Sequence, residues 1–176
     1  MIPKEFRIPI IVQVAIFFIP MNIYIIGDWM GTGIQWVFCR YVQAFIAQAS
    51  TTRTITSIIP LSREIGMIIS GQLIGRSALA SIFWAAGAVL LVIALVVLLY
   101  GASRMDSSFI RKTSLVNAGC ILLFILSILT QYGILFHGPA GTTIPVGLPV
   151  FAVIAYWQYR HAASSPAEPE TIANPA

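Results

Sequence analysis

Long apolar runs, separated by short polar stretches, dominate the chain. The two longest, residues 79–100 and 115–136, contain no charged side chain. An α-helix needs roughly 20 apolar residues to cross the hydrocarbon core of a bilayer, which is about 30 Å thick. Both runs meet this length, so we predict a membrane-spanning helix at each. Trp84 and Tyr100 lie toward the ends of the first run, as expected for aromatic side chains at a membrane interface.

Two further apolar runs, residues 8–27 and 144–159, lie near the ends of the chain. The first follows Lys4 and Arg7 and is longer than the roughly 7–15 apolar residues of a cleaved signal peptide, so it predicts a retained first span. Pro20 within it has no backbone N–H to donate and should kink that helix. The second run is short, since a span needs about 17 residues, and it predicts a short membrane helix.

The stretch between the first and second runs is harder to assign. Residues 31–49 are apolar but interrupted, and Gln35, Cys39 and Gln43 recur at intervals of four residues. On a helix this spacing produces one polar face. We therefore predict a helix that either lies in the membrane interface or spans the membrane with that face toward other helices. Residues 62–76 predict a second, shorter helix that is also either interfacial or spanning.

Together these elements predict an all-α integral membrane protein, a polytopic helix bundle with four main hydrophobic segments and two shorter embedded or interfacial helices. We expect residues 1–161 to form a single membrane domain. Residues 162–176 are rich in Ala, Ser, Pro and Glu. Because this tail lacks the apolar content to pack, we predict that it is disordered.

The composition supports a membrane protein with the lipid bilayer as its partner. Of 176 residues, 58% are apolar and only 9% are charged, whereas soluble domains have about 25% charged residues. The formal net charge is +4, but the basic residues are dispersed, which argues against a nucleic-acid partner. In the predicted topology Lys4, Arg104, Arg111, Lys112 and Arg160 share one side. The preference of Lys and Arg for the cytoplasmic side then places both termini in the cytoplasm, in a multi-pass protein of the cell membrane.

Cys39 and Arg40 form the first candidate polar site, together with the nearby glutamines. A positive charge beside a thiol favours the reactive thiolate, so the pair could act as a nucleophile within the membrane. The alternative, which we favour, is an interfacial helix whose Arg40 side chain extends to the lipid headgroups.

Arg63 and Glu64 form a second candidate, either as a gate or headgroup site with Arg76 or as ordinary charges at a helix end. His137 is the third, in a glycine- and proline-rich turn. A histidine there could be a general base, a metal ligand or a pH sensor. In both cases we favour the structural alternative, a polar group at the membrane interface.

Small residues in the 62–76 segment predict contacts with other helices. Gly66 and Ser70, and Gly71 and Gly75, are each four residues apart, a spacing that lets helix backbones approach closely. We expect a contact there with other membrane proteins or with a second copy of the chain. The chain contains no zinc-protease, nucleotide-binding or serine-hydrolase motif. We therefore predict no metal and no cofactor, and we favour a non-catalytic protein.

The leading functional hypothesis is a non-catalytic accessory or scaffold subunit. A small transporter or channel component is an alternative, because interrupted helices line substrate sites in transporters. A membrane-embedded enzyme that uses Cys39, Arg40 or His137 is another. This last hypothesis requires the three side chains to converge, since catalytic groups act on one substrate.

Overall fold

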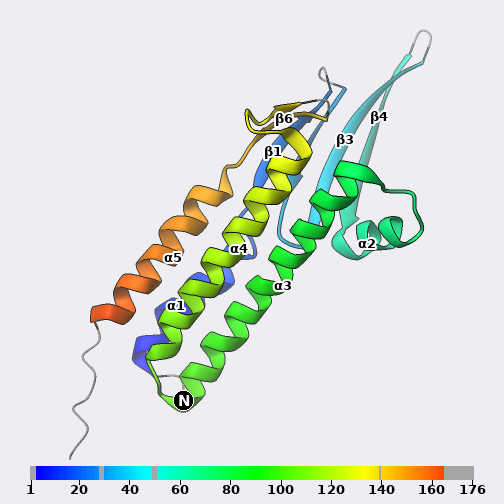
Figure 1. The fold of residues 1–176 in the computed structure, drawn as a ribbon. Helices are drawn as coiled ribbons and strands as arrows, with labels where there is room; N and C mark the ends of the chain where they lie inside the picture. The colour runs from blue at the N-terminus through cyan, green and yellow to red at the C-terminus, as the bar shows by residue number, and fades with distance from the viewer. Residues whose placement is uncertain (1–2, 28–29, 49–50, 139, 165–176) are drawn as a thin grey trace, which may run out of the picture.

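The structure is a computed structural model that describes residues 3–27, 30–48, 51–138 and 140–164. Within these residues the chain forms five helices and a six-stranded sheet (Figure 1). The elements in chain order are α1 (Lys4–Ile16), β1 (Asn22–Ile26), β2 (Gly31–Gln35), β3 (Cys39–Gln48), β4 (Thr51–Pro60), α2 (Leu61–Ile69), α3 (Gly75–Arg104), α4 (Ser108–Tyr132), β5 (His137–Gly138), β6 (Gly141–Ile144) and α5 (Gly147–Ser164).

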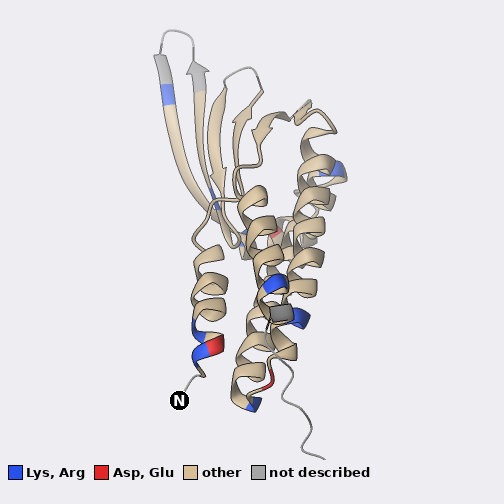
Figure 2. Cartoon of the chain, turned by 90° about the vertical axis from the view of Figure 1, so that its left-hand side faces the viewer, with Lys and Arg blue, Asp and Glu red and all other residues tan. Residues whose placement is uncertain are grey.

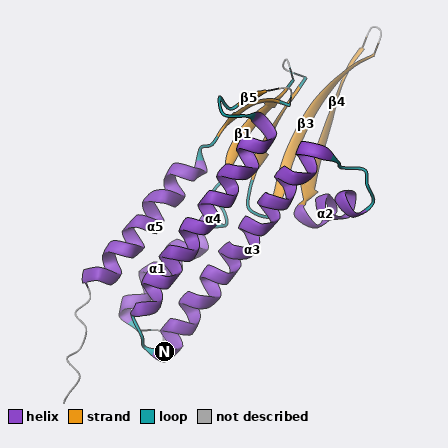
Figure 3. Ribbon diagram, in the orientation of Figure 1, coloured by secondary structure: helices purple, strands orange, loops and turns teal. Residues whose placement is uncertain are grey.

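Helices and strands occupy opposite ends of an elongated molecule. Helices α1, α3, α4 and α5 lie side by side as a bundle, with α3 packed on α4 and α4 on α5. The sheet continues from one end of this bundle, and its strands run in roughly the same direction as the helices (Figures 1 and 3). The short helix α2 packs between β4 and α3 at the base of the sheet.

The predicted all-α fold is wrong, because strands β1 to β6 form an antiparallel sheet with the strand order β4-β3-β2-β1-β6-β5. Among the described residues, two helices are long and apolar enough to cross a membrane, α3 and α4. They contain the predicted span 79–100 and most of the predicted span 115–136. The uninterrupted apolar runs were therefore interpreted correctly as helices, whereas the interrupted ones were not.

The predicted helix over residues 31–49 is instead β2 and β3. A spacing of four residues is compatible with a helix and also with one face of a strand, where side chains alternate with a period of two. The glycines are the more informative feature. A Cβ on Gly31 would lie 2.5 Å from the Gln43 backbone oxygen, and one on Gly33 would lie 2.2 Å from the Tyr24 ring. Both are positions where a neighbouring strand or ring approaches the backbone closely.

The first and last apolar runs each contain a helix and a strand. Helix α1 ends at Ile16, and Pro20 lies in the turn before β1, so it separates two elements instead of kinking one. The last run begins in β6 and continues as α5, whose helix extends through residues 162–164. The rest of the predicted disordered tail, residues 165–176, lies outside the described residues.

The predicted 62–76 helix is shorter in the structure. Helix α2 ends at Ile69, and α3 begins at Gly75. Gly71 and Gly75 have φ of +72° and +64°, values that favour glycine. Gly71 lies in the turn after α2, and Gly75 is the first residue of α3. Gly71 and Gly75 therefore do not form a packing face on one helix. Contact with a partner through Gly66 on α2 and Ser70, the residue that follows α2, stays a prediction.

Three buried amides join α1, α4 and α5 inside the bundle. The side chains of Gln13, Asn117 and Gln158 are 0%, 3% and 0% exposed. Asn117 Nδ2 donates to Gln13 Oε1 and Gln158 Oε1, both at 2.8 Å, while Gln13 Nε2 donates to Asn117 Oδ1 at 3.1 Å. Gln158 Nε2 also donates to Gln13 Oε1 at 3.1 Å. Because every amide finds a partner, the network holds three helices in one register without leaving a buried polar group unpaired.

Candidate functional site

A buried ion pair joins the sheet to the helices. Arg40 on β3 pairs with Glu64 on α2 through Arg40 Nη2 and Glu64 Oε1. The Glu64 side chain is 0% exposed and that of Arg40 is 26% exposed. Ser81 on α3 donates its hydroxyl to Glu64 Oε2 at 2.5 Å. One carboxylate therefore connects a strand and two helices.

Local sequence explains why Glu64 points inward. Pro60 ends β4 and has the fixed φ that suits the residue before a helix. The backbone N–H of Leu61 then donates to Phe38 O at 2.7 Å, which holds the start of α2 beside the β2–β3 turn. Arg63 and Ile65 on either side of Glu64 are exposed, so Glu64 lies on the single face that α2 turns toward Arg40 and Ser81.

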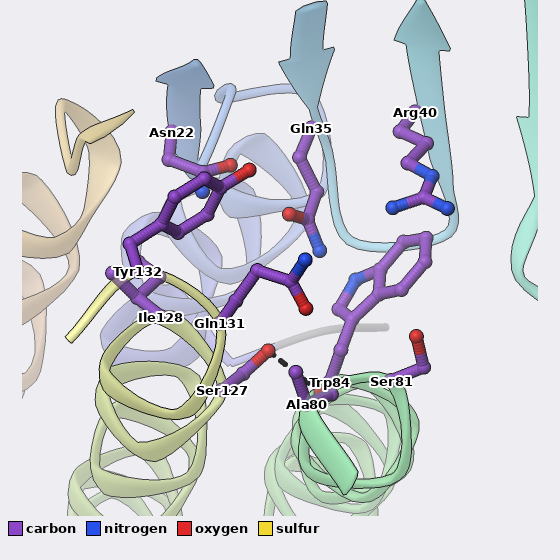
Figure 4. A pocket seen from close by; sticks show the side chains of 10 residues that line it. All are labelled: Asn22, Gln35, Arg40, Ala80, Ser81, Trp84, Ser127, Ile128, Gln131 and Tyr132. Atoms are coloured by element: carbon purple, nitrogen blue, oxygen red, sulfur yellow. Dashed lines mark hydrogen bonds between the residues drawn. The ribbon is translucent and has the colours of Figure 1, made fainter. Parts of the chain in front are cut away.

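Arg40 belongs to a polar row that crosses three strands. Asn22 on β1 pairs with Gln35 on β2, and Gln35 pairs with Arg40 on β3. Directly paired residues of an antiparallel sheet share a face. Figure 4 shows these three side chains pointing toward the ends of α3 and α4, where Ser81 and Gln131 lie.

A small cavity of about 20 Å³ lies between this row and the helices. Its lining residues are Asn22, Gln35, Arg40, Ala80, Ser81, Trp84, Ser127, Ile128, Gln131 and Tyr132 (Figure 4). Asn22 Oδ1 and Arg40 Nε are buried, and neither has a hydrogen-bond partner among the described residues. A cavity of this size holds about one water molecule, which can both donate and accept. The geometry thus suits a hydrated polar junction and not a pocket for a metabolite.

Aromatic side chains surround the junction. Trp84 is 1% exposed and donates its indole N–H to Trp36 O at 3.1 Å. The prediction that Trp84 lies at the membrane interface is therefore wrong, because its side chain is buried in the core. Tyr24 lies against Gly33 and donates its hydroxyl to Tyr41 O at 3.3 Å. Burial is the main cause that raises the pKa of Tyr24 to about 12, so its hydroxyl stays protonated.

The candidate site residues predicted from the sequence do not form one site. Arg40 and Glu64 meet, although they were assigned to separate sites, and Arg40 is not on an interfacial helix. Cys39 is a free thiol on the opposite face of β3, beside an apolar hollow that Phe17 and Trp36 also line. Arg63 is exposed on α2.

His137 lies far from the other candidates. Its Nδ1 is 2.7 Å from Thr142 Oγ1 at the sheet edge formed by β5. Strands β2, β1 and β6 separate β5 from β3, so about four strand spacings, roughly 19 Å in all, lie between His137 and Arg40. Cys39, Arg40 and His137 therefore do not form one catalytic site.

The helix side of the junction, above all Ser81 and Gln131, was not predicted from the sequence. Both are isolated polar residues inside or at the end of an apolar run, which is the usual sequence sign of a helix position that faces protein instead of lipid. Comparison of the chain with models of known protein families and with curated proteins found no match.

Proposed function

We propose that this protein is a membrane-embedded scaffold whose antiparallel sheet, on one side of the membrane, recruits an extended segment of a partner protein. Helices α3 and α4 have the length and hydropathy of spans. Helices α1 and α5 are shorter and lie beside the part of α3 and α4 that is away from the sheet (Figure 1). Their outer faces are apolar: Ile8, Ile11 and Val153 are 57%, 67% and 67% exposed. Such a surface suits lipid, so we propose that α3 and α4 cross the bilayer and that α1 and α5 contact lipid beside them, in a multi-pass protein of the cell membrane.

The distribution of charge supports one orientation. The end of the bundle away from the sheet, where the N-terminus of the chain lies, carries six basic residues: Lys4, Arg7, Arg104, Arg111, Lys112 and Arg160. We call it the basic end. Figure 2 shows several of the Lys and Arg positions, coloured blue, toward this end. Since Lys and Arg near spans favour the cytoplasmic side, we place this end and both termini in the cytoplasm, and the sheet on the opposite side.

The open edge of β4 is the observation that carries the scaffold proposal. Strand β4 is ten residues long and, in the part of the chain that the structure describes, pairs only with β3. Thr54, Ile55 and Thr56 are exposed, and Arg53 is its one charged residue. Soluble proteins usually protect such an edge with charges, bulges or a covering element, because its unpaired N–H and C=O groups bind other strands. A long and nearly uncharged edge fits strand addition by a partner.

The outer face of the sheet adds to this surface. It is the face turned away from α3 and α4, and it leaves Ile23, Ile58 and Ile144 exposed at 41%, 67% and 59%. Near its base lies the apolar hollow of about 390 Å³ that includes Phe38 and Tyr41. Exposed apolar patches of this kind mark interaction surfaces.

The direction of the strands supports a partner other than a second copy of the chain. Two copies of β4 that paired antiparallel would be related by a two-fold axis perpendicular to the sheet. The strands run along the bundle (Figure 1), so this rotation would turn the second copy upside down relative to the membrane. Self-pairing is therefore disfavoured within one bilayer. We propose instead an extended segment of a different protein, neutral or acidic opposite Arg53.

The alternative functions have less support. The enzyme hypothesis needs Cys39, Arg40 and His137 to converge, and they lie on two faces and two distant strands. The transport hypothesis needs a polar path, and the polar cavity at the junction has room for about one water molecule.

Site-specific photo-crosslinking tests the proposal. Thr32, Gln43 and Thr56 form one row across β2, β3 and β4 on the outer face. A photoreactive amino acid at Thr56 is at the edge, while one at Thr32 is two strands inward on the same face, which makes it a matched control. In native membranes we expect a discrete adduct from position 56, mapping to one segment of the partner, and little from position 32.

Equal adducts at both positions would mean that the partner covers the outer face and not the edge. No adduct at either position would remove the support for a recruiting role. In addition, the variant Thr56→Lys should reduce the adduct formed from a probe at Thr54, because a lysine on the edge opposes strand addition, whereas Thr32→Lys should not.

A further inference from the structure

A groove between α4 and α5 opens to the outside of the bundle near its basic end. Its volume is about 350 Å³, and small, aliphatic and aromatic residues line it: Ser114, Leu115, Ala118, Ile121, Ala152, Ala155, Tyr156 and Tyr159. Leu115 and Tyr156 are 61% and 62% exposed. Alanine on both helices leaves the space open, because its side chain ends at Cβ. The groove is thus largely apolar and open on the surface that would face lipid.

Two arginines lie at the basic end of this groove. Arg111 precedes Ser114 and Leu115 by one helical turn on α4, and its Nη2 donates to the Tyr159 hydroxyl at 3.2 Å. Arg160 follows Tyr156 by one turn on α5, and its Nη1 donates to the Tyr156 hydroxyl at 3.5 Å. Each guanidinium also lies near a tyrosine ring. Arg111 Cζ is 5.2 Å from the centre of the Tyr159 ring, and Arg160 Cζ is 6.0 Å from the centre of the Tyr156 ring. The two tyrosines that line the groove therefore hold the two positive charges at its mouth.

The length of the groove fits one leaflet of a bilayer. From Arg111 to Ile121 the α4 helix rises by about 15 Å, at 1.5 Å per residue. This equals half of the roughly 30 Å hydrocarbon thickness. An acyl chain whose headgroup is at the level of Arg111 would therefore end near the middle of the membrane, at the inner end of the groove.

We propose that this groove is a binding site for an anionic phospholipid of the cytoplasmic leaflet. Its phosphate is held by Arg111 and Arg160, and one acyl chain lies between α4 and α5. The two guanidinium groups provide the charge that complements a net-negative lipid. A zwitterionic lipid can bind the same phosphate contacts, but its own ammonium group opposes the arginines. The proposal rests on the membrane orientation proposed above, because it requires the basic end to meet a headgroup layer.

Native mass spectrometry of the delipidated full-length protein in detergent tests the site. The protein is titrated with dioleoyl phosphatidylglycerol or with dioleoyl phosphatidylcholine. The phosphatidylglycerol should bind more tightly to the native protein. The double variant R111Q/R160Q should lose roughly 30-fold in affinity for it, about fivefold for each positive charge near an anionic headgroup. The control R53Q/R63Q removes two exposed charges elsewhere and should bind as the native protein does.

A second pair of variants tests the apolar part of the site. Ala118→Phe fills the groove with a ring and should weaken binding of both lipids, while Ala15→Phe places the same ring on an exposed position of α1 and should not. The conservative variant R111K/R160K keeps the charge and should retain most of the preference for phosphatidylglycerol. Melting temperatures close to that of the native protein would show that the variants fold.

Two results would overturn the lipid site. One is an unchanged preference for phosphatidylglycerol in R111Q/R160Q, and the other is native affinity in Ala118→Phe. Neither result bears on the recruiting edge of β4. If instead the protein leaves the membrane fraction without detergent, the membrane placement itself fails, and with it both proposals.

Discussion

The Arg40–Glu64 pair gives the sharpest test of the junction between sheet and helices, because its two members differ in burial. Glu64 is 0% exposed, whereas Arg40 is 26% exposed. Removing Arg40 leaves a carboxylate with no access to water. Removing the charge of Glu64 leaves a guanidinium that can still reach solvent. The two single variants should therefore differ, even though they break the same interaction.

The expected magnitudes follow from this difference. Removal of one partner from a buried ion pair costs about 3–5 kcal/mol, so Arg40→Met should lose that much free energy of unfolding. Glu64→Gln keeps an acceptor for the Ser81 hydroxyl and should lose about 1–2 kcal/mol, the cost of one weakened hydrogen bond to a charged group. For a chain of this size each kcal/mol lowers the melting temperature by roughly 2–4 °C. The first variant should then melt roughly 6–20 °C below the native protein, and the second roughly 2–8 °C below it.

Denaturant unfolding of the detergent-purified protein, followed by tryptophan fluorescence, measures both variants, since Trp84 lines the junction. The double variant Arg40→Met, Glu64→Leu completes the comparison. Replacing a buried ion pair with apolar groups is often close to neutral, so it should be more stable than Arg40→Met alone. Equal losses in the two single variants, or a double variant less stable than either of them, would refute the account of the pair as a buried charge that needs its partner.

Two further predictions concern the helix bundle and use the same stability measurement. Asn117→Leu removes the central amide of the network with Gln13 and Gln158. It should lower the free energy of unfolding by about 1–2 kcal/mol, near the upper range for polar contacts between membrane helices. A loss no larger than that of an exposed substitution such as Leu122→Ala would contradict this prediction. Gly87→Ala should destabilise by about 1–3 kcal/mol, because the added Cβ would lie 2.5 Å from Phe124 Cε1. Gly119→Ala on the facing helix is the control, because the atom nearest to its added Cβ, Leu90 Cδ1, would be 3.6 Å away. A loss of stability as large as that of Gly87→Ala would show that packing at Phe124 is not the cause.

The two long apolar helices could be predicted from the sequence because their evidence is local. Residues 79–100 and most of 115–136 form helices, as their uninterrupted apolar content indicates. Residues 31–49 could not be assigned in the same way. Their apolar positions fit two periodicities, and the choice of strand depends on contacts with β1 and β4, which are distant in the chain. The glycines at 31 and 33 were the available sign, since close backbone approach excludes a Cβ.

The candidate site, too, could be predicted only in part from the sequence. Arg40 and Glu64 were each noticed as charged residues in an apolar segment, a rare and informative feature. Their pairing, and the part played by Ser81 and Gln131, depends on how β3, α2 and α3 meet at the end of the bundle. The sequence by itself determined that the chain has two long apolar helices and a basic end, because these properties follow from composition along a continuous stretch. The tertiary structure alone decided that the intervening residues form a sheet, that its β4 edge stays open and that the buried charges pair, because strand pairing and charge burial depend on groups that only folding brings together.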